Sequence, residues 1–262
     1  MDDILSSFYA LFGRYARGFY SDDINGCKNI ELKVEHTYRV CEDIVEIAGS
    51  LGLCRDEIRL AEIIALFHDI GRFEQLARYG TFSDRASEDH AALGLVVLKS
   101  LDALSGLSDF ERRIATRSIK LHNCYELPAD EPEECLLYTR LIRDADKLDI
   151  LGIVADYNEE RHIRPNPAME LDLPDLPGFS GIVVDDLLNH RLAKIGDLRT
   201  YNDLKLLYLG WAFDINFPYT LSCIRERRYM ERIVSTLPDA DEVRQVYGHI
   251  CSYIDERLDS GI

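Results

Sequence analysis

The sequence predicts an all-α protein, and three observations support this fold class. Apolar residues recur every three or four positions along most of the 262 residues, which is the period of an α-helix. Signals that begin helices precede several of these segments, for example the capping box of Ser108 and Glu111. Apart from one short strand expected at 182–184, no segment has the composition of a β-rich region.

The first helix is expected within the N-terminal twenty residues, which contain Arg14 and Arg17 and lack the basic leader of a secretion signal. Ser87, followed by two acidic residues, predicts the start of a later helix that reaches about Leu101. The segment 133–153 is apolar on two opposite faces, which predicts a helix buried in the centre of the fold. The periodicity places the other helices at 31–49, 57–70, 108–122, 185–194, 201–215, 219–236 and 240–258.

Residues 161–181 differ in composition from the rest of the chain, because they contain four of its eight prolines and two glycines. This composition predicts an irregular proline-rich loop or lid. We therefore expect a helical core with an N-terminal helix over 1–160, the loop over 161–181, and a C-terminal helical extension over 182–262. The length is compatible with all three packing as one compact domain.

The formal net charge is −17, with a pI of about 4.8. A surface this acidic repels phosphate polymers and anionic lipid, so neither generic nucleic-acid binding nor membrane binding is expected. No apolar run approaches the roughly 20 residues that span a bilayer. The seven cysteines are scattered without a C-x-x-C pair, which is typical of reduced thiols and favours a cytoplasmic protein.

Four of the seven histidines lie on or beside apolar helix faces. A single buried histidine is more often an ordinary core residue than a ligand. Burying several imidazoles together with carboxylates is costly unless they are paired or bind a metal. Mixed imidazole and carboxylate donors suit Mn, Fe, Co, Ni or Zn better than Ca. The residues concerned are His36, His68, Asp69, His90, His122 and either Asp144 or Asp146, between which periodicity does not choose.

Three strings of this sequence resemble the motifs of the HD-domain superfamily of metal-dependent phosphohydrolases. They are H36-T-Y-R-V, L-F-H68-D69-I-G-R and R-D-A-D146-K-L-D, in the family's order H…HD…D. The resemblance covers roughly residues 30–155 and implies an HD-domain helical bundle with additional C-terminal helices. It also implies a metal ion on His36, His68, Asp69 and Asp146, and it makes Asp144 a structural or supporting residue.

Two further histidines resemble the branch of this superfamily that binds a second ion. H90-A-A-L-G94 is similar to its H-x-x-x-G segment, whereas H122-N123 keeps only the first imidazole of its His-His pair. The resemblance thus implies one or two divalent ions (Mn, Fe, Ni, Co, Zn or Mg), with Asp69, His90 and His122 on the second. Without a second ion, His90 could cap its own helix and His122 could donate to a substrate phosphate.

The resemblance implies hydrolysis of a phosphomonoester or phosphodiester in a small phosphorylated substrate, which we expect to be nucleotide-like. Asp69 is expected to be catalytic, because it would hold both ions and orient the nucleophile. Cations near the metal are expected to bind the phosphate, although surface ion pairs explain Arg72 and Lys147 equally well. The candidates are Arg72 and Lys147, both also assigned catalytic roles, and the more distant Lys120 and Arg143. Asp84 could carry a proton, but a solvated position at the tip of its loop is the favoured interpretation.

Two other functions are compatible with the same residues. Some HD-domain proteins are mixed-valent di-iron oxygenases with the same ligand pattern, and this is the main alternative to hydrolysis. A non-catalytic sensor with this fold is the third possibility, and it is disfavoured because such proteins usually lack ligands. The sequence specifies neither the substrate nor the oligomeric state.

Overall fold

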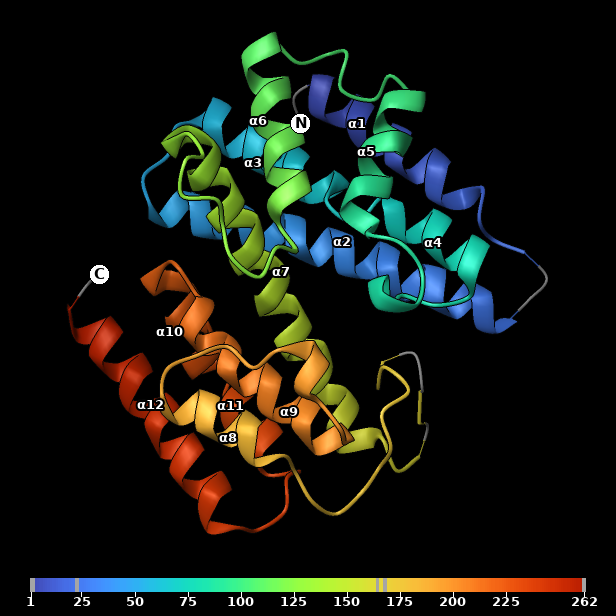
Figure 1. The fold of residues 1–262 in the computed structure, drawn as a ribbon. Helices are drawn as coiled ribbons and strands as arrows, with labels where there is room; N and C mark the ends of the chain where they lie inside the picture. The colour runs from blue at the N-terminus through green and yellow to red at the C-terminus, as the bar shows by residue number, and fades with distance from the viewer. Residues whose placement is uncertain (1–2, 22–23, 164, 167–168, 261–262) are drawn as a thin grey trace. The chain divides into compact units, whose positions relative to one another are not determined.

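A computed structural model describes residues 3–21, 24–163, 165–166 and 169–260. Within these residues the protein is built from α-helices and short 3₁₀-helices, and no β-strand is present (Figure 1). The predicted all-α fold class is therefore confirmed. The chain divides into two compact units, residues 1–149 and 150–262.

The described residues of the first unit form six complete α-helices, one short 3₁₀-helix and most of a seventh α-helix. They are α1 (Asp3–Arg17), α2 (Ile24–Ser50), α3 (Arg55–Phe67), α4 (Gly71–Tyr79), the 3₁₀-helix η1 (Asp84–Ala86), α5 (His90–Ser100), α6 (Asp109–Leu121) and the beginning of α7 (Glu133–Glu160). Helix α3 packs against α1, α2 and α6, and α4 packs against α2 and α5. The apolar side chains of α3, including Ile64, Leu66 and Phe67, are fully buried, so α3 lies at the centre of this unit.

Helix α7 has the two apolar faces that the sequence predicted. Leu141 and Leu148 on one side, and Ile142 and Ala145 on the other, are fully buried in the first unit. Helix α6, which precedes α7 in the chain, begins at the predicted capping box, in which the Ser108 backbone N–H donates to the Glu111 carboxylate (2.9 Å). Both elements thus form as their sequence patterns indicate.

The second unit contains the end of α7 and the C-terminal helices. These are α8 (Gly181–Leu188), the 3₁₀-helix η2 (Ile195–Asp197), α9 (Tyr201–Gly210), the 3₁₀-helix η3 (Trp211–Asp214), α10 (Pro218–Glu226), α11 (Tyr229–Val234) and α12 (Asp241–Ser260). Helix α12 packs against α8 and α10, and α9 packs against α8 and α11. The described residues of 161–180 form turns and irregular backbone.

Three details differ from the sequence-based expectations. The strand expected at 182–184 is wrong, because these residues begin α8 and bury Val183, Val184 and Leu187 on one helical face. Helix α5 begins at His90 and not at Ser87, because the Asp89 side chain accepts from Ala92 N (2.9 Å) and caps it. The helix expected over 219–236 is interrupted at Arg228, whose φ of 56° is left-handed.

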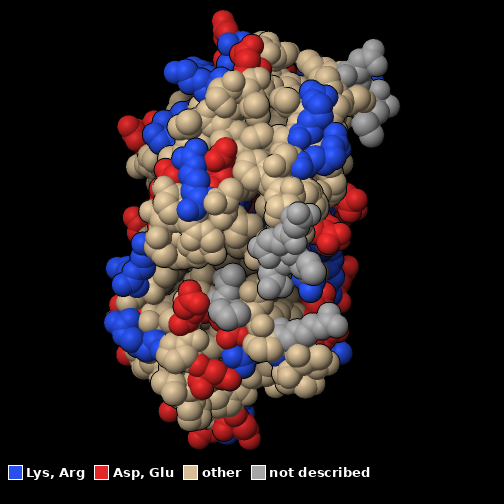
Figure 2. Space-filling view, turned by 90° about the vertical axis from the view of Figure 1, so that its right-hand side faces the viewer, with Lys and Arg blue, Asp and Glu red and all other residues tan. Residues whose placement is uncertain are grey.

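Acidic and basic side chains are both present and interspersed on the face drawn in Figure 2. Among the described residues, no helix has the length and apolar character needed to cross a membrane.

Candidate metal centre

The ends of three helices deliver imidazoles to the interior of the first unit. His68 directly follows α3, His122 directly follows α6, and His90 is the first residue of α5. His36 comes from the middle of α2, and all four histidines are at most 4% exposed. Asp69 follows His68 in the turn between α3 and α4, so it also lies in this interior.

The first group of donors consists of His36, His68, Asp146 and one oxygen of Asp69. Nε2 of His36 lies 3.2 Å from Oδ1 of Asp146 and 3.6 Å from Oδ2 of Asp69. Nε2 of His68 lies 3.6 Å and 3.8 Å from the same two oxygens. Two imidazoles and two carboxylates therefore converge on one small volume, and they come from α2, from the α3–α4 turn and from α7.

The second group consists of His90, His122 and the other oxygen of Asp69. Oδ1 of Asp69 lies 3.2 Å from Nε2 of His90 and 3.8 Å from Nε2 of His122. The two Nε2 atoms are 3.0 Å apart. The Asp69 carboxylate consequently stands between the two groups and presents one oxygen to each.

All four imidazoles are oriented by a hydrogen-bond acceptor at Nδ1. The acceptors for His36, His68, His90 and His122 are, respectively, Asp149 Oδ2 (2.6 Å), Ala65 O (2.7 Å), Asp84 Oδ2 (2.7 Å) and Ile119 O (2.7 Å). Because a carbonyl or carboxylate oxygen only accepts, each Nδ1 carries the proton. In the neutral rings each Nε2 then has a lone pair directed into the centre, which is the arrangement of metal-ligating histidines.

These lone pairs need a cation. The Nε2 atoms of His36 and His68 are buried without a hydrogen-bond partner, which is costly for polar atoms. The lone pairs of His90 and His122 face each other at 3.0 Å and would repel one another unless a cation lay between or beside them. The donor set thus fits divalent transition-metal ions. Among the described residues, three sets of side chains bring possible ligand atoms within 4.8 Å of one another: His36, His68 and Asp146; His68, Asp69 and His122; and Asp84, Asp89 and His90.

The carboxylates of the centre are held in their charged form. Burial raises the pKa of Asp69, but Lys33, His68 and Arg72 outweigh this effect and hold its pKa well below the usual range. Burial also raises the pKa of Asp146, but the adjacent His36 and His68 outweigh this effect and hold its pKa well below the usual range. Anionic oxygens are therefore present at the centre across the physiological pH range.

Two cationic side chains contact the two oxygens of Asp69. Nζ of Lys33 lies 2.8 Å from Oδ2, and Nε of Arg72 lies 3.5 Å from Oδ1. Nη1 of Arg72 is already bonded to Gln75 and Asp84 (both 2.9 Å), whereas its buried Nε has no hydrogen-bond partner. Lys33 was not singled out in the sequence, although it lies one helical turn before His36.

Two glycines explain why His90 can approach Asp69. A Cβ added to Gly71 would lie 2.2 Å from the backbone oxygen of His90 and 2.5 Å from the backbone nitrogen of Gly94. Helices α4 and α5 therefore cross in backbone contact, and only glycine fits at position 71. The glycines of the H-D-I-G and H-A-A-L-G strings thus place the N-terminus of α5 beside the α3–α4 turn.

Asp84 is not the solvated loop-tip residue that was favoured from the sequence. Its side chain is 34% exposed, and it accepts from His90 and from Arg72. Burial raises the pKa of Asp84, but the contacts with His90 and Arg72 outweigh this effect and hold the pKa below its usual range. The loop between α4 and α5 folds back onto the centre, and periodicity within a loop offers no signal for such a contact.

Asp149 was also missed by the sequence-based prediction. It is 6% exposed and accepts from Nδ1 of His36 and from Nε of Arg39 (2.5 Å). A signal was present, since Asp149 lies three residues after Asp146 and therefore on a neighbouring part of the same helix surface.

The other predicted site residues occupy different environments. Arg143 is buried and its guanidinium donates to the backbone oxygens of His122 (3.0 Å) and Cys124, so it supports the end of α6. Lys120 is exposed, Lys147 is 8% exposed and Asp144 is fully buried. Lys147 follows Asp146 directly on α7, so the two side chains leave the helix about 100° apart.

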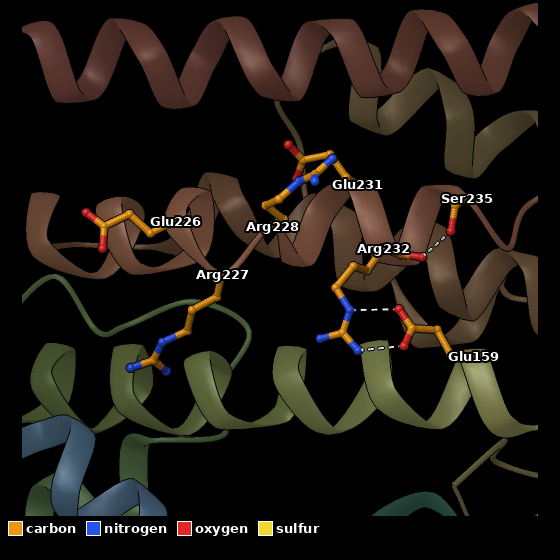
Figure 3. Close-up of a pocket in the computed structure, with 7 residues that line it drawn as sticks. All are labelled: Glu159, Glu226, Arg227, Arg228, Glu231, Arg232 and Ser235. Atoms are coloured by element: carbon orange, nitrogen blue, oxygen red, sulfur yellow. Dashed lines mark hydrogen bonds and ion pairs between the residues drawn. The ribbon is translucent and has the colours of Figure 1, made fainter.

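The second unit contains a surface hollow of about 420 Å³ beside α10 and α11 (Figure 3). Its charged side chains have both signs, and Arg232 pairs with Glu159 through two hydrogen bonds of 2.7 and 2.8 Å. No histidine or cysteine lines it, so it lacks the donors of a transition-metal site. The lining residues are Glu159, Glu226, Arg227, Arg228, Glu231, Arg232 and Ser235.

Helices that surround buried, oriented imidazoles and carboxylates define a candidate metalloprotein of the all-α class. A comparison with protein families agrees, since residues 34–151 match the HD domain model. This segment of the chain is therefore similar to the HD domain, a family whose members are mostly metal-dependent hydrolases. Comparisons with curated proteins and with solved structures gave no match.

Proposed function

We propose that the protein is a metal-dependent phosphohydrolase that cleaves a phosphomonoester or phosphodiester in a small, nucleotide-like substrate. The observation that carries this proposal is the convergence of four oriented Nε2 atoms on the two oxygens of Asp69 and on Asp146. This donor set suits Mn, Fe, Ni, Co or Zn, and Mg is a weaker candidate.

Two ions would be held by the two groups of donors. His36, His68, Asp146 and Oδ2 of Asp69 would hold the first ion, and His90, His122 and Oδ1 of Asp69 would hold the second. When bound, such ions lower the pKa of a water molecule and polarise a phosphoryl oxygen. Asp69 would then contribute one oxygen to each ion, because its Oδ2 faces His36 and His68 and its Oδ1 faces His90 and His122.

The side chains around the donors would prepare the site for an anion. Asp149 and Asp84 keep the rings of His36 and His90 in the orientation that directs Nε2 inward. The buried Nε of Arg72 is a donor without a hydrogen-bond partner, so it can donate to a phosphoryl oxygen beside Asp69. Roles for Lys120, Arg143 and Lys147 in substrate binding stay predictions, and Arg143 is the least favoured because its guanidinium supports the His122 segment.

A direct test is a screen of phosphorylated metabolites, including nucleoside mono-, di- and cyclic phosphates, with Mn²⁺, Ni²⁺, Co²⁺, Fe²⁺, Zn²⁺ and Mg²⁺. The proposal predicts release of phosphate or of a phosphomonoester that depends on the ion. The variant Asp69→Asn should be inactive with every ion, because it removes the charge shared by both groups. Equal turnover in the variant would identify a contaminating enzyme and contradict the proposal.

The same donor set also supports a second chemistry, that of a mixed-valent di-iron oxygenase. Iron analysis of protein purified without air, followed by oxygen-consumption assays with candidate substrates, separates the two functions. Two irons per chain with oxygen uptake that depends on the substrate would replace the hydrolase proposal. A protein that binds no ion and gains no stability from one would instead support a non-catalytic sensor.

A further inference from the structure

Lys33 occupies an unusual position beside the first group of donors. It lies on α2, one turn before His36, and its side chain is 16% exposed. Its ammonium donates to Oδ2 of Asp69 at 2.8 Å, which is shorter than the 3.5 Å between Nε of Arg72 and Oδ1 of the same carboxylate. The lysine thereby neutralises a buried carboxylate that would otherwise be costly to bury.

Lys33 contacts the same oxygen of Asp69, Oδ2, that faces the imidazoles of His36 and His68. Oδ2 of Asp69 lies 3.6 Å from Nε2 of His36 and 3.8 Å from Nε2 of His68. Because metal–oxygen bonds are about 2.0–2.2 Å, a divalent ion on Oδ2 would lie within about 5 Å of Nζ if the lysine did not move. Two cations at such a separation in a buried site repel one another strongly.

We propose that the Lys33 ammonium competes with the first metal ion for Oδ2 of Asp69 and that, once displaced, it binds the anionic group of the substrate. In the metal-free protein, the Lys33 ammonium thus balances the negative charge of Asp69. The identity of the anion as a phosphate rests on the proposed function, whereas the competition for Asp69 does not.

The surroundings of Lys33 allow the displacement. Nζ also lies 5.4 Å from the centre of the Phe82 ring, so the ammonium has a second favourable neighbour in the loop after α4. A lysine has a long flexible stem, and the partial exposure of this one leaves it a route toward solvent. An ammonium released there would stand beside the ions, where a phosphate oxygen could contact both.

Calorimetric titrations of the full chain with Mn²⁺ test the competition. Lys33→Gln removes the charge and keeps a donor for Asp69, and Lys28→Gln removes a charge from an exposed position of the same helix as a control. We expect Lys33→Gln to bind its first Mn²⁺ about tenfold more tightly than the wild type, and Lys28→Gln to be unchanged. An unchanged or weaker Mn²⁺ affinity in Lys33→Gln would overturn the competition.

The second half of the proposal is measured on the Mn²⁺-loaded proteins with inorganic phosphate as the probe. Lys33→Gln should bind phosphate about tenfold more weakly than the wild type, and Lys33→Arg should recover most of the affinity because it restores the charge. Equal phosphate affinity in Lys33→Gln and wild type would overturn the role in anion binding. Neither titration requires turnover, so the results stand even if the protein proves not to be a hydrolase.

A measurement on the wild-type chain covers the case in which metal-free Lys33→Gln does not fold. Limited acetylation of lysines, read by mass spectrometry, reports how accessible each amine is. Mn²⁺ should increase the acetylation of Lys33 severalfold, because the amine leaves Asp69, and should leave Lys28 unchanged. If Mn²⁺ leaves the acetylation of Lys33 unchanged or lowers it, the lysine is not displaced and the proposal is wrong.

Discussion

At the scale of single residues, the centre depends on one carboxylate that faces two ways. Oδ2 of Asp69 faces the imidazoles of His36 and His68, and Oδ1 faces those of His90 and His122. A side chain with one donor atom could serve only one of the two pairs. The carboxylate stays anionic although it is buried, because cations lie beside it.

The residues behind the imidazoles are also testable. Asp149→Asn should weaken binding of the first ion by about 10- to 100-fold, because an amide group can donate to Nδ1 of His36 and so move the ring proton to Nε2. Calorimetric titration with Mn²⁺ measures this effect. Asp156→Asn, an exposed position further along α7, is the control, and an equal loss in both variants would show that Asp149 has no specific role.

The ion-free protein should lose stability in mild acid through His122. Burial, together with the neighbouring His90 and His68, lowers the pKa of His122 from 6.5 to about 3. Between these values the unfolded chain binds a proton that the folded protein does not, so the free energy of unfolding falls as the pH falls. The slope contributed is at most about 1.4 kcal/mol per pH unit.

Urea denaturation in the presence of a chelator, between pH 6 and pH 4.5, measures this slope. Above pH 6 the raised pKa of His36 has the opposite effect, because the free energy of unfolding then increases as the pH falls. Below pH 4.5 the carboxylates begin to bind protons. His122→Gln should have the shallower slope. A slope identical to that of the wild type would show that His122 is not the residue responsible.

At the scale of elements, helix ends do most of the positioning. Two imidazoles directly follow α3 and α6, and a third begins α5, so small changes in helix packing move these side chains directly. The contact between Gly71 on α4 and the start of α5 is the tightest of these packing constraints.

Gly71→Ala should therefore damage the second group of donors. The added Cβ would meet backbone atoms of His90 and Gly94, which cannot rotate away, so α5 must shift. We expect a loss of about 3 kcal/mol in the free energy of unfolding and the loss of the second ion. Chemical denaturation and metal analysis measure the two effects.

Gly49→Ala is the matched control, because a Cβ at this position of α2 meets nothing within 4 Å. It should be neutral or slightly stabilising, since alanine favours a helix over glycine by up to about 1 kcal/mol. Equal effects of the two substitutions would contradict the proposed role of the α4–α5 contact.

Much at this scale could be predicted from the sequence, because helical periodicity reports which faces are buried. The capping box at Ser108 and the two apolar faces of α7 are examples. The convergence of the histidines also followed from their apolar surroundings and the family resemblance. The contacts of Lys33 and Asp84 could not be predicted, because they join segments far apart in the chain or lie in a loop without a period.

At the scale of the whole molecule, the chain has a net charge of −17, so the proposed anionic substrate would have to bind against the field of the protein. Cations placed at the site, namely Lys33, Arg72 and the proposed ions, would reverse that field locally. The division of the chain into two units further predicts that an ion acts on the unit of residues 1–149, where all the donors lie.

Thermal unfolding tests this expectation. A concentration of Mn²⁺ 100-fold above its Kd should stabilise the wild type by about 2.7 kcal/mol and raise its Tm. Asp69→Asn should show no increase. If the two units unfold in separate transitions, only that of the first unit should shift with Mn²⁺, and a shift confined to the second unit would contradict the assignment.

The central claim is that buried side chains from separate helices bind metal ions together, and counting the ions per chain tests it most directly. We expect two ions in the wild type, about one in His90→Ala and in His122→Ala, and almost none in Asp69→Ala. Elemental analysis of the purified, reloaded proteins provides the counts. A wild type that retains no ion, or variants with the same ion content as the wild type, would contradict the account.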